Sequence, residues 1–322
     1  MTIKISGTGS ALPKKILTNA DLEKMVDTSD AWITERTGMK ERHIAEEETV
    51  VSLAAEACRR ALADAGKSAE EVDLIVMATC TPDMLLPCSA CQVQSELGAK
   101  NAVAFDLNAA CAGFLFALQT AHAYITSGVY RNALVIGAEL LSKIIDWTDR
   151  GTCVLFGDGG GAVFVERSDD DTQGILSQVQ GSDGVRGPVL SCRARHAERA
   201  DLFEGEDTFV HMNGGEVYKF AVRQVPDCIE KALAKAELKA EDIDLYVLHQ
   251  ANIRIIEAIA KRLKVGMEHF PVNLDRVGNT SSAAIPLLLD ELNKSGKIQK
   301  GQRLVLSGFG AGLTYGACVL RW

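Results

Sequence analysis

The chain repeats part of itself. Residues 60–76 (RALADAGKSAEEVDLIV) recur 171 positions later as residues 231–247 (KALAKAELKAEDIDLYV). Both copies have the pattern of an amphipathic helix, an acidic turn and a buried strand. Alanine-rich helices can resemble one another by chance, but here the turn and the strand follow in the same register. The repeat predicts a fold built from two duplicated α/β halves.

Short apolar runs alternate with helical patterns along the whole chain. They lie at Leu74–Thr79, Ala133–Gly137, Leu245–Leu248 and Arg303–Ser307. Short apolar strands between helices are typical of sheets that are buried on both faces. The 322 residues suffice for two domains or for one large α/β unit. The polar stretch around Ser168–Asp171 predicts the join, with halves of residues 1–170 and 171–322.

The composition bounds the partners and the location. A net charge of −9 disfavours nonspecific binding to nucleic acid. Neither a signal peptide nor an apolar run of about 20 residues is visible, so we expect a cytoplasmic protein that does not enter a membrane. The nine cysteines are odd in number and scattered. Reduced thiols are therefore a better interpretation of these cysteines than a disulfide framework.

Cys111 stands among small residues where a strand pattern gives way to an apolar helix, in Asp106–Leu118 (DLNAACAGFLFAL). Small neighbours leave room for a substrate, and the positive end of the helix dipole favours thiolate. This context predicts a nucleophile, although a buried structural cysteine remains the alternative.

Two further polar residues lie at the ends of predicted elements. His249 ends the apolar run LYVL, where its side chain can point into a cleft, although a structural histidine is the alternative. Asn279, in Asn273–Leu289, lies at a transition similar to that of Cys111. A helix N-cap would explain Asn279, but Thr280 or Ser281 can cap equally well and leave its amide free.

Three other motifs carry weaker signals. Gly308–Gly312 (GFGAG) follows a strand, and its backbone N–H groups can face an oxyanion. Neither this stretch nor Gly157–Gly161 is followed by the lysine of a phosphate-binding P-loop. Cys88 and Cys91 form a single CxxC, which is a weak indication of a metal site. We expect no metal.

Around Cys111, His249 and Asn279 the chain closely resembles the β-ketoacyl-acyl carrier protein synthase III family. The resemblance covers essentially the whole chain and rests on SGTGSALPKKILTN, TSDAWITERTGMKERH, DLNAACAGFLFAL, DWTDRGTCVLFGDGGGA, HQANIRII, GNTSSAAIPLLL and SGFGAGLTYGA, in this order. It implies an α/β thiolase-like fold with five layers, α-β-α-β-α. Elongating synthases, by contrast, have a second histidine in place of Asn279, and thiolases use a second cysteine.

The resemblance also implies the activity. The enzyme would transfer an acyl group from acyl-CoA to Cys111 and condense it with malonyl-acyl carrier protein, giving 3-oxoacyl-carrier protein, CoA and CO₂. We expect no cofactor, since acyl-CoA is a substrate. We expect the protein to form a homodimer. A secondary-metabolite acyltransferase with the same trio and a non-catalytic scaffold that binds carrier protein are the alternatives.

Family roles carry over to further positions of this chain. The resemblance implies that CoA is bound by Trp32, Arg36, Arg150 and Asn252. It implies that the carrier protein docks on Gln250, Ala251, Asn252, Ile253 and Arg254. It also implies an oxyanion hole formed by the backbone N–H groups of Cys111 and Ala311, and an acyl pocket lined by Leu86 and Phe309. Leu86 would reach into the partner subunit, where many relatives have a phenylalanine. One contact departs from the family, because Gly215 stands where relatives have an asparagine near the pantetheine arm.

Overall fold

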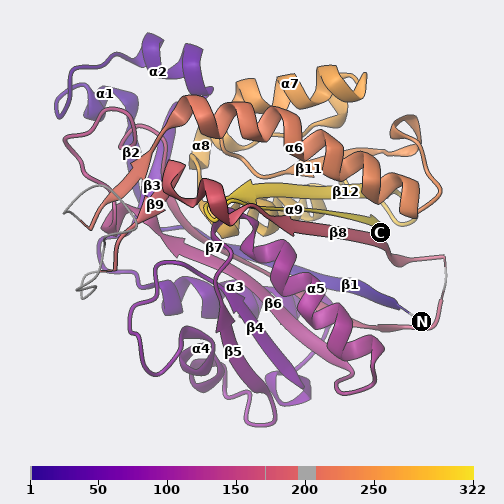
Figure 1. The fold of residues 1–322 in the computed structure, drawn as a ribbon. Helices are drawn as coiled ribbons and strands as arrows, with labels where there is room; N and C mark the ends of the chain where they lie inside the picture. Colours follow the sequence, from indigo (N-terminus) through magenta and orange to yellow (C-terminus); the bar gives the residue numbers. More distant parts are fainter. Residues whose placement is uncertain (1, 171, 195–207) are drawn as a thin grey trace.

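The computed structural model describes residues 2–170, 172–194 and 208–322. Asp171, at the predicted join, lies outside these residues. Two mixed sheets dominate the fold (Figure 1). The five-stranded sheet has the order β1 (Thr2–Ala11), β7 (Asp158–Ser168), β6 (Asn132–Leu140), β4 (Leu74–Ala78), β5 (Val103–Leu107), and the four-stranded sheet has the order β11 (Leu245–Leu248), β12 (Arg303–Gly310), β13 (Thr314–Arg321), β8 (Gly174–Ser182).

The predicted apolar strands are confirmed. Residues 74–78, 132–140, 245–248 and 303–310 are β4, β6, β11 and β12; β4 pairs with β6 in parallel in the first sheet, and β11 pairs with β12 in parallel in the second. β4 is buried along its whole length. Burial of both faces explains why these strands lack the polar alternation of a half-exposed sheet.

Helices cover and separate the two sheets, which confirms the five-layered thiolase-like fold. α3 (Val50–Ala65) and α4 (Ser89–Leu97) pack outside the first sheet. α5 (Gly113–Thr126) and α9 (Ala284–Lys294) lie between the sheets. α6 (Gly214–Lys235) covers the second sheet, and α7 (Ile253–Leu263) packs against α6 (Figure 1). The middle layer meets a sheet on each side, so α5 buries half of its 14 residues and α9 buries eight of its 11.

The smaller elements frame this core. The hairpin of β2 (Lys15–Thr18) and β3 (Glu41–Ile44) encloses α1 (Asn19–Leu22) and α2 (Asp30–Thr37). β9 (Leu190–Cys192) pairs with β10 (Val210–Met212). The remaining short helices are α8 (Leu274–Val277), η1 (Ala69–Glu71), η2 (Ala110–Ala112), η3 (Leu141–Lys143), η4 (Gly184–Val189), η5 (Ala240–Asp242), η6 (Met267–His269) and η7 (Ser281–Ala283).

The two copies of the repeat take equivalent places. α3, η1 and β4 form the first copy, and α6, η5 and β11 form the second. One expectation was wrong: no strand leads into Asn279, because the short helix α8 stands where β5 stands in the first half. Asn279 keeps only an isolated parallel bridge to Phe156. The division at residue 170 stays a prediction.

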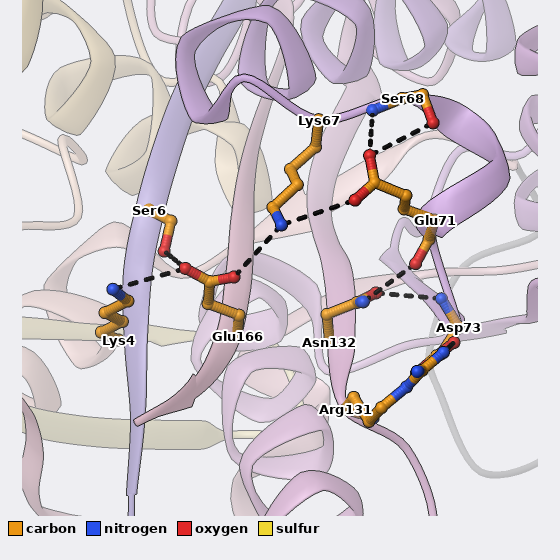
Figure 2. A network of polar contacts seen from close by, with 9 residues as sticks. All are labelled: Lys4, Ser6, Lys67, Ser68, Glu71, Asp73, Arg131, Asn132 and Glu166. Atoms are coloured by element: carbon orange, nitrogen blue, oxygen red, sulfur yellow. Dashed lines mark hydrogen bonds and ion pairs between the residues drawn. The ribbon is translucent and has the colours of Figure 1, made fainter. Parts of the chain in front are cut away.

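A polar network closes the end of the first sheet at which β4 and β6 begin (Figure 2). Asp73 forms an ion pair with Arg131 (3.1 Å) and accepts the Arg131 backbone N–H (2.9 Å). In the second half Asp244 accepts the backbone N–H of Arg303, at the start of β12 (2.7 Å). The repeated aspartates therefore fasten equivalent strand ends, and the opposite ends of these strands carry the predicted site.

Candidate active site

Cys111 lies in a strained turn at the start of α5. Ala110 has a φ of +46°, a left-handed value that is costly for a residue with a side chain. Two hydrogen bonds hold the turn: Asn108 Oδ1 accepts the Ala110 N–H (3.1 Å), and the Thr314 hydroxyl donates to the Ala109 carbonyl (2.8 Å). The predicted passage from strand to helix is confirmed, with β5 before the turn and α5 after it.

The end of β12 lies directly against this turn. A Cβ atom built on Gly310 would come within 2.5 Å of the Cys111 backbone nitrogen and 3.0 Å of its Cβ. Only glycine permits this approach without a shift of the backbone. Ala311 follows at once, so the two predicted oxyanion donors, Cys111 and Ala311, belong to segments that touch.

Asn279 lies in a turn of the same kind. Its Oδ1 accepts the Ser281 N–H (3.0 Å), and Ser281 has a φ of +51°. Neither Thr280 nor Ser281, the alternative caps, caps α9, because its N-cap is Ala283 and makes no side-chain cap bond. In the described part of the chain nothing accepts a hydrogen bond from Asn279 Nδ2. The amide is thus oriented with a free donor.

His249 follows β11 and is almost fully buried, with 4% of its surface exposed. Its backbone N–H donates to the Ser307 carbonyl (2.8 Å), and its ring meets Phe309 edge to face at 5.7 Å. Burial lowers the pKa of His249 to about 4, so the imidazole is neutral at pH 7. Nδ1 has no partner within the described residues. The tautomer with its proton on Nε2 would make that nitrogen a donor.

The resting Cys111 is a thiol, contrary to the expectation of a thiolate at the helix start. The pKa of Cys111 is raised to about 12, mainly by burial, and the nearby Glu139 acts in the same direction. The Ser281 side chain and the Cys111 backbone act in the opposite direction. The residue keeps some exposed surface, which leaves access for a substrate.

Glu139 is a functional candidate that the sequence analysis missed. It lies in β6, is completely buried, and accepts hydrogen bonds from residues 79–81, after β4, and from the turn that follows Asn279. The signal was present, since a glutamate interrupts the apolar strand NALVIGAEL. A carboxylate is rarely buried unless it is well partnered.

The predicted CoA residues gather around Trp32 on α2. The guanidinium carbons of Arg36 and Arg150 lie 4.8 Å and 4.9 Å from the Trp32 ring centroid, which is cation–π distance. Arg150 also donates to the Asp27 carbonyl (2.7 Å). At this separation Arg150 contacts the indole of Trp32 directly, so an adenine base that enters between the two side chains must displace Arg150.

The predicted docking segment divides into buried and exposed parts. Gln250 is fully buried and donates to the Leu248 carbonyl (2.9 Å), so it offers no surface to a partner. Ala251 and Ile253 are half-buried. Asn252 caps α7 by accepting the Arg254 N–H (2.8 Å) and donates to the Arg36 carbonyl (3.0 Å), which joins α7 to α2. Arg254 is exposed beside this junction.

The two predicted acyl-pocket residues differ sharply in burial. Phe309 is 4% exposed and contacts His249, whereas Leu86 is 82% exposed. The structure therefore does not bring Leu86 to the site within one chain. Gly215 lies at the start of α6, and a Cβ there would meet only Asn213 Oδ1, at 3.6 Å. An asparagine at this position would fit.

Three properties of the described residues limit the possible chemistry and location of the site. These residues contain no group of histidine, cysteine, aspartate or glutamate side chains able to hold a metal ion. All nine cysteines are free, which agrees with the expectation of reduced thiols. No helix there is long and apolar enough to cross a membrane.

The chain matches the models of a known protein family over two parts of its length. Residues 105–184 match the family model of 3-oxoacyl-[acyl-carrier-protein] synthase III, and residues 233–322 match the model of its C-terminal part. The β-ketoacyl-[acyl-carrier-protein] synthase III of Clostridium acetobutylicum is 50% identical over 100% of this chain and 99% of that protein.

Solved structures agree in fold. The synthase III of Aquifex aeolicus superposes with a TM-score of 0.93 at 48% identity, covering 99% of this chain and 100% of the other. A priming β-ketosynthase of a polyketide pathway gives a TM-score of 0.92 at 36% identity, covering 99% and 96%.

Proposed function

Because the chain belongs to the β-ketoacyl-[acyl-carrier-protein] synthase III family, we propose that it catalyses the condensation that initiates type II fatty acid synthesis. An acyl-CoA donates the starter group, and malonyl-acyl carrier protein extends it. The observation that carries the site assignment is the meeting of the Cys111 turn, the Asn279 turn and the end of β12, with His249 beside β12.

The first half-reaction is an acyl transfer. The sulfur of Cys111 attacks the thioester carbonyl of acyl-CoA, the bond to the CoA sulfur breaks, and the proton of the thiol passes to CoA. The oxyanion that forms is stabilised by the backbone N–H groups of Cys111 and Ala311. Gly310 supports this role, because it lets the two segments approach.

The second half-reaction removes CO₂ from the malonyl group and leaves an enolate on its thioester. Neutral His249 and the Nδ2 amide of Asn279 donate hydrogen bonds to the enolate oxygen. The enolate carbon attacks the acyl carbonyl on Cys111, the C–S bond breaks, and the released thiolate takes a proton from water. The product is 3-oxoacyl-carrier protein.

The remaining residues are proposed to bind the two carriers. Trp32, Arg36 and Arg150 would hold the adenine end of CoA, with Asn252 nearer its pantetheine arm. Arg254 would attract the acidic carrier protein. A homodimer would cover Leu86 and complete the acyl pocket, and a cytoplasmic location stays a prediction.

Two measurements test the proposal. Intact-protein mass spectrometry after exposure to a panel of acyl-CoAs should show one acyl adduct per chain, located on Cys111. Addition of malonyl-carrier protein should remove the adduct and give 3-oxoacyl-carrier protein. An adduct that only another acceptor removes would favour the secondary-metabolite enzyme, and the absence of any adduct would favour a scaffold.

A further inference from the structure

Thr314 is the first residue of β13 and closes the hairpin with β12, since it pairs with Gly310. Its hydroxyl oxygen lies 2.8 Å from the Ala109 carbonyl oxygen and 3.1 Å from the Ala311 carbonyl oxygen. Ala109 belongs to the turn before Cys111, whereas Ala311 belongs to the hairpin loop. One hydroxyl proton is therefore shared between the two segments that carry the proposed oxyanion donors.

The contact with Ala109 completes the hold on one peptide plane. The carbonyl of Ala109 and the N–H of Ala110 belong to the same planar peptide unit. Thr314 donates to that carbonyl, and Asn108 Oδ1 accepts that N–H (3.1 Å). With both polar groups engaged, the peptide cannot rotate without the loss of a hydrogen bond, and its orientation supports the costly φ of +46° at Ala110. The next peptide along the chain carries the N–H of Cys111.

The hairpin loop that carries the second donor is held on two sides. Leu313 exchanges backbone hydrogen bonds with Asp183, which follows β8 (2.7 Å and 2.9 Å). On the side of the Cys111 turn, the Thr314 hydroxyl holds the loop. Gly310 permits the close approach of these two segments, and the hydroxyl adds a directional bond that fixes their separation.

We propose that Thr314 is a positioning residue of the oxyanion hole, whose hydroxyl holds the N–H groups of Cys111 and Ala311 at the separation that an acyl-transfer oxyanion requires. This inference rests on the proposed function, because that function assigns the two donors. Preorganised donors stabilise an oxyanion where it develops, and a displaced donor loses part of that effect. The role of Thr314 is therefore confined to steps that pass through a tetrahedral oxyanion.

Two replacements separate the hydroxyl of Thr314 from the shape of its side chain. Thr314→Val keeps the branched shape and removes the hydroxyl, whereas Thr314→Ser keeps the hydroxyl and removes the methyl group. At saturating acyl-CoA, the rate of acyl-adduct formation should fall about tenfold in Thr314→Val, since a donor is displaced but not lost. Thr314→Ser should stay within about twofold of the parent, because the hydrogen bond remains. Thr126→Val, which removes a hydroxyl bond of 2.7 Å at the far end of α5, is the matched control.

A second rate, measured on the same proteins, separates the oxyanion donors from the sulfur itself. Iodoacetamide alkylates Cys111 by displacement of iodide at a tetrahedral carbon, so no oxyanion develops. Thr314→Val should therefore change the alkylation rate less than about twofold. A variant in which the sulfur had been moved or buried would lose both rates. Rapid quench with intact mass follows the acyl adduct, and peptide mass follows alkylation at Cys111.

Two results would overturn the proposal: acyl transfer by Thr314→Val within twofold of the parent, or a parallel fall of acyl transfer and alkylation. Thr314→Ala also removes the hydroxyl and should show the same selective loss, so it replaces Thr314→Val if thermal unfolding shows that the valine variant does not fold. The absence of any adduct on the parent protein would overturn the proposed function, and this inference with it. A parent that forms the adduct and a valine variant that forms it equally fast would overturn this inference alone.

Discussion

The turn at Asn108–Cys111 and the turn at Asn279–Ser282 are two versions of one structure, 171 positions apart. In each, an asparagine Oδ1 accepts the backbone N–H two residues on, at 3.1 Å and 3.0 Å. In each turn, the residue that donates this N–H has a left-handed φ, +46° for Ala110 and +51° for Ser281. The duplication therefore extends from the helices to the strained turns of the site.

The two turns differ in what lies against them. Gly310 approaches the Cys111 turn and leaves its amide open, whereas Glu139, at the equivalent position 171 residues earlier, fills the space against Ser282. Cys111 and Ser282 are themselves equivalent. The comparison teaches that a duplicated frame acquired two functions through a few side chains, with one turn left open for chemistry and the other locked so that Asn279 is held in place.

The largest effect, on formation of the acyl adduct, should come from replacing the equivalent residues Cys111 and Ser282 by alanine, one at a time. Cys111→Ala removes the only acceptor sulfur at the open turn, so no acyl adduct should form. Ser282→Ala loses one hydrogen bond of the locked turn and should still form the adduct. Intact mass after incubation with acyl-CoA measures both, and an adduct on the Cys111→Ala protein would remove Cys111 from its proposed role.

Gly310→Ala tests the openness of the first turn. A methyl group 2.5 Å from the Cys111 nitrogen must push the turn aside, and a shift of about 1 Å can cost about 10² in rate. We expect acyl transfer to fall by about that factor. Gly184→Ala, which has no atom within 4 Å of the new methyl, is the control. Normal acyl transfer by Gly310→Ala would show that the close approach has no catalytic role.

Arg254→Glu tests whether the two half-reactions use different carriers. Charge reversal should reduce the use of malonyl-carrier protein about tenfold at low salt, because steering by an exposed charge is screened as salt rises. Loading from acyl-CoA should change less than twofold. Lys100→Glu makes the same charge change on the far side of the fold, after α4, and should affect neither. Equal losses with both substrates would assign Arg254 a structural role.

An effect of similar size, on selectivity and not on overall rate, concerns the starter group. If a partner subunit buries Leu86, its size relative to phenylalanine leaves a deeper pocket, and each buried CH₂ contributes about 0.8 kcal/mol. The parent should use butyryl-CoA or isobutyryl-CoA at least as well as acetyl-CoA. Leu86→Phe should shift kcat/KM towards acetyl-CoA by about tenfold, whereas the equally exposed neighbour Leu85 should tolerate the same change. Strong acetyl selectivity that Leu86→Phe leaves unaltered would contradict this.

Periodicity was enough to predict the apolar strands, whereas the five-layered fold was implied by the family resemblance. The run LYVL, for example, is β11 without a residue of difference, because burial on both faces leaves a continuous apolar run. The helix α8 could not be predicted in the same way, since a four-residue helix between turns has no period to detect. There the second half departs from the first.

The site was only partly visible in the sequence. His249 stands out because it follows the apolar run LYVL, and Cys111 and Asn279 stand out because an apolar helix pattern follows each of them. The displacement of 171 could have paired Asn279 with Asn108. The protonation of Cys111 could not be predicted, since it depends on burial and on Glu139, which lies 28 positions away. Likewise, nothing in the segment HQANIR shows that Gln250 points inward and Arg254 outward.

The division of labour between the two turns is tested most directly by Asn279→Ala and Asn108→Ala, assayed side by side in the two half-reactions. Asn279→Ala removes an enolate donor, so malonyl decarboxylation should fall by about 10²–10³ while acyl transfer to Cys111 changes little. Asn108→Ala removes one hydrogen bond that shapes the Cys111 turn, so acyl transfer should fall by up to about tenfold and decarboxylation should fall less. Opposite selectivities in the two variants are the predicted result, and equal loss of both half-reactions in both variants would contradict it.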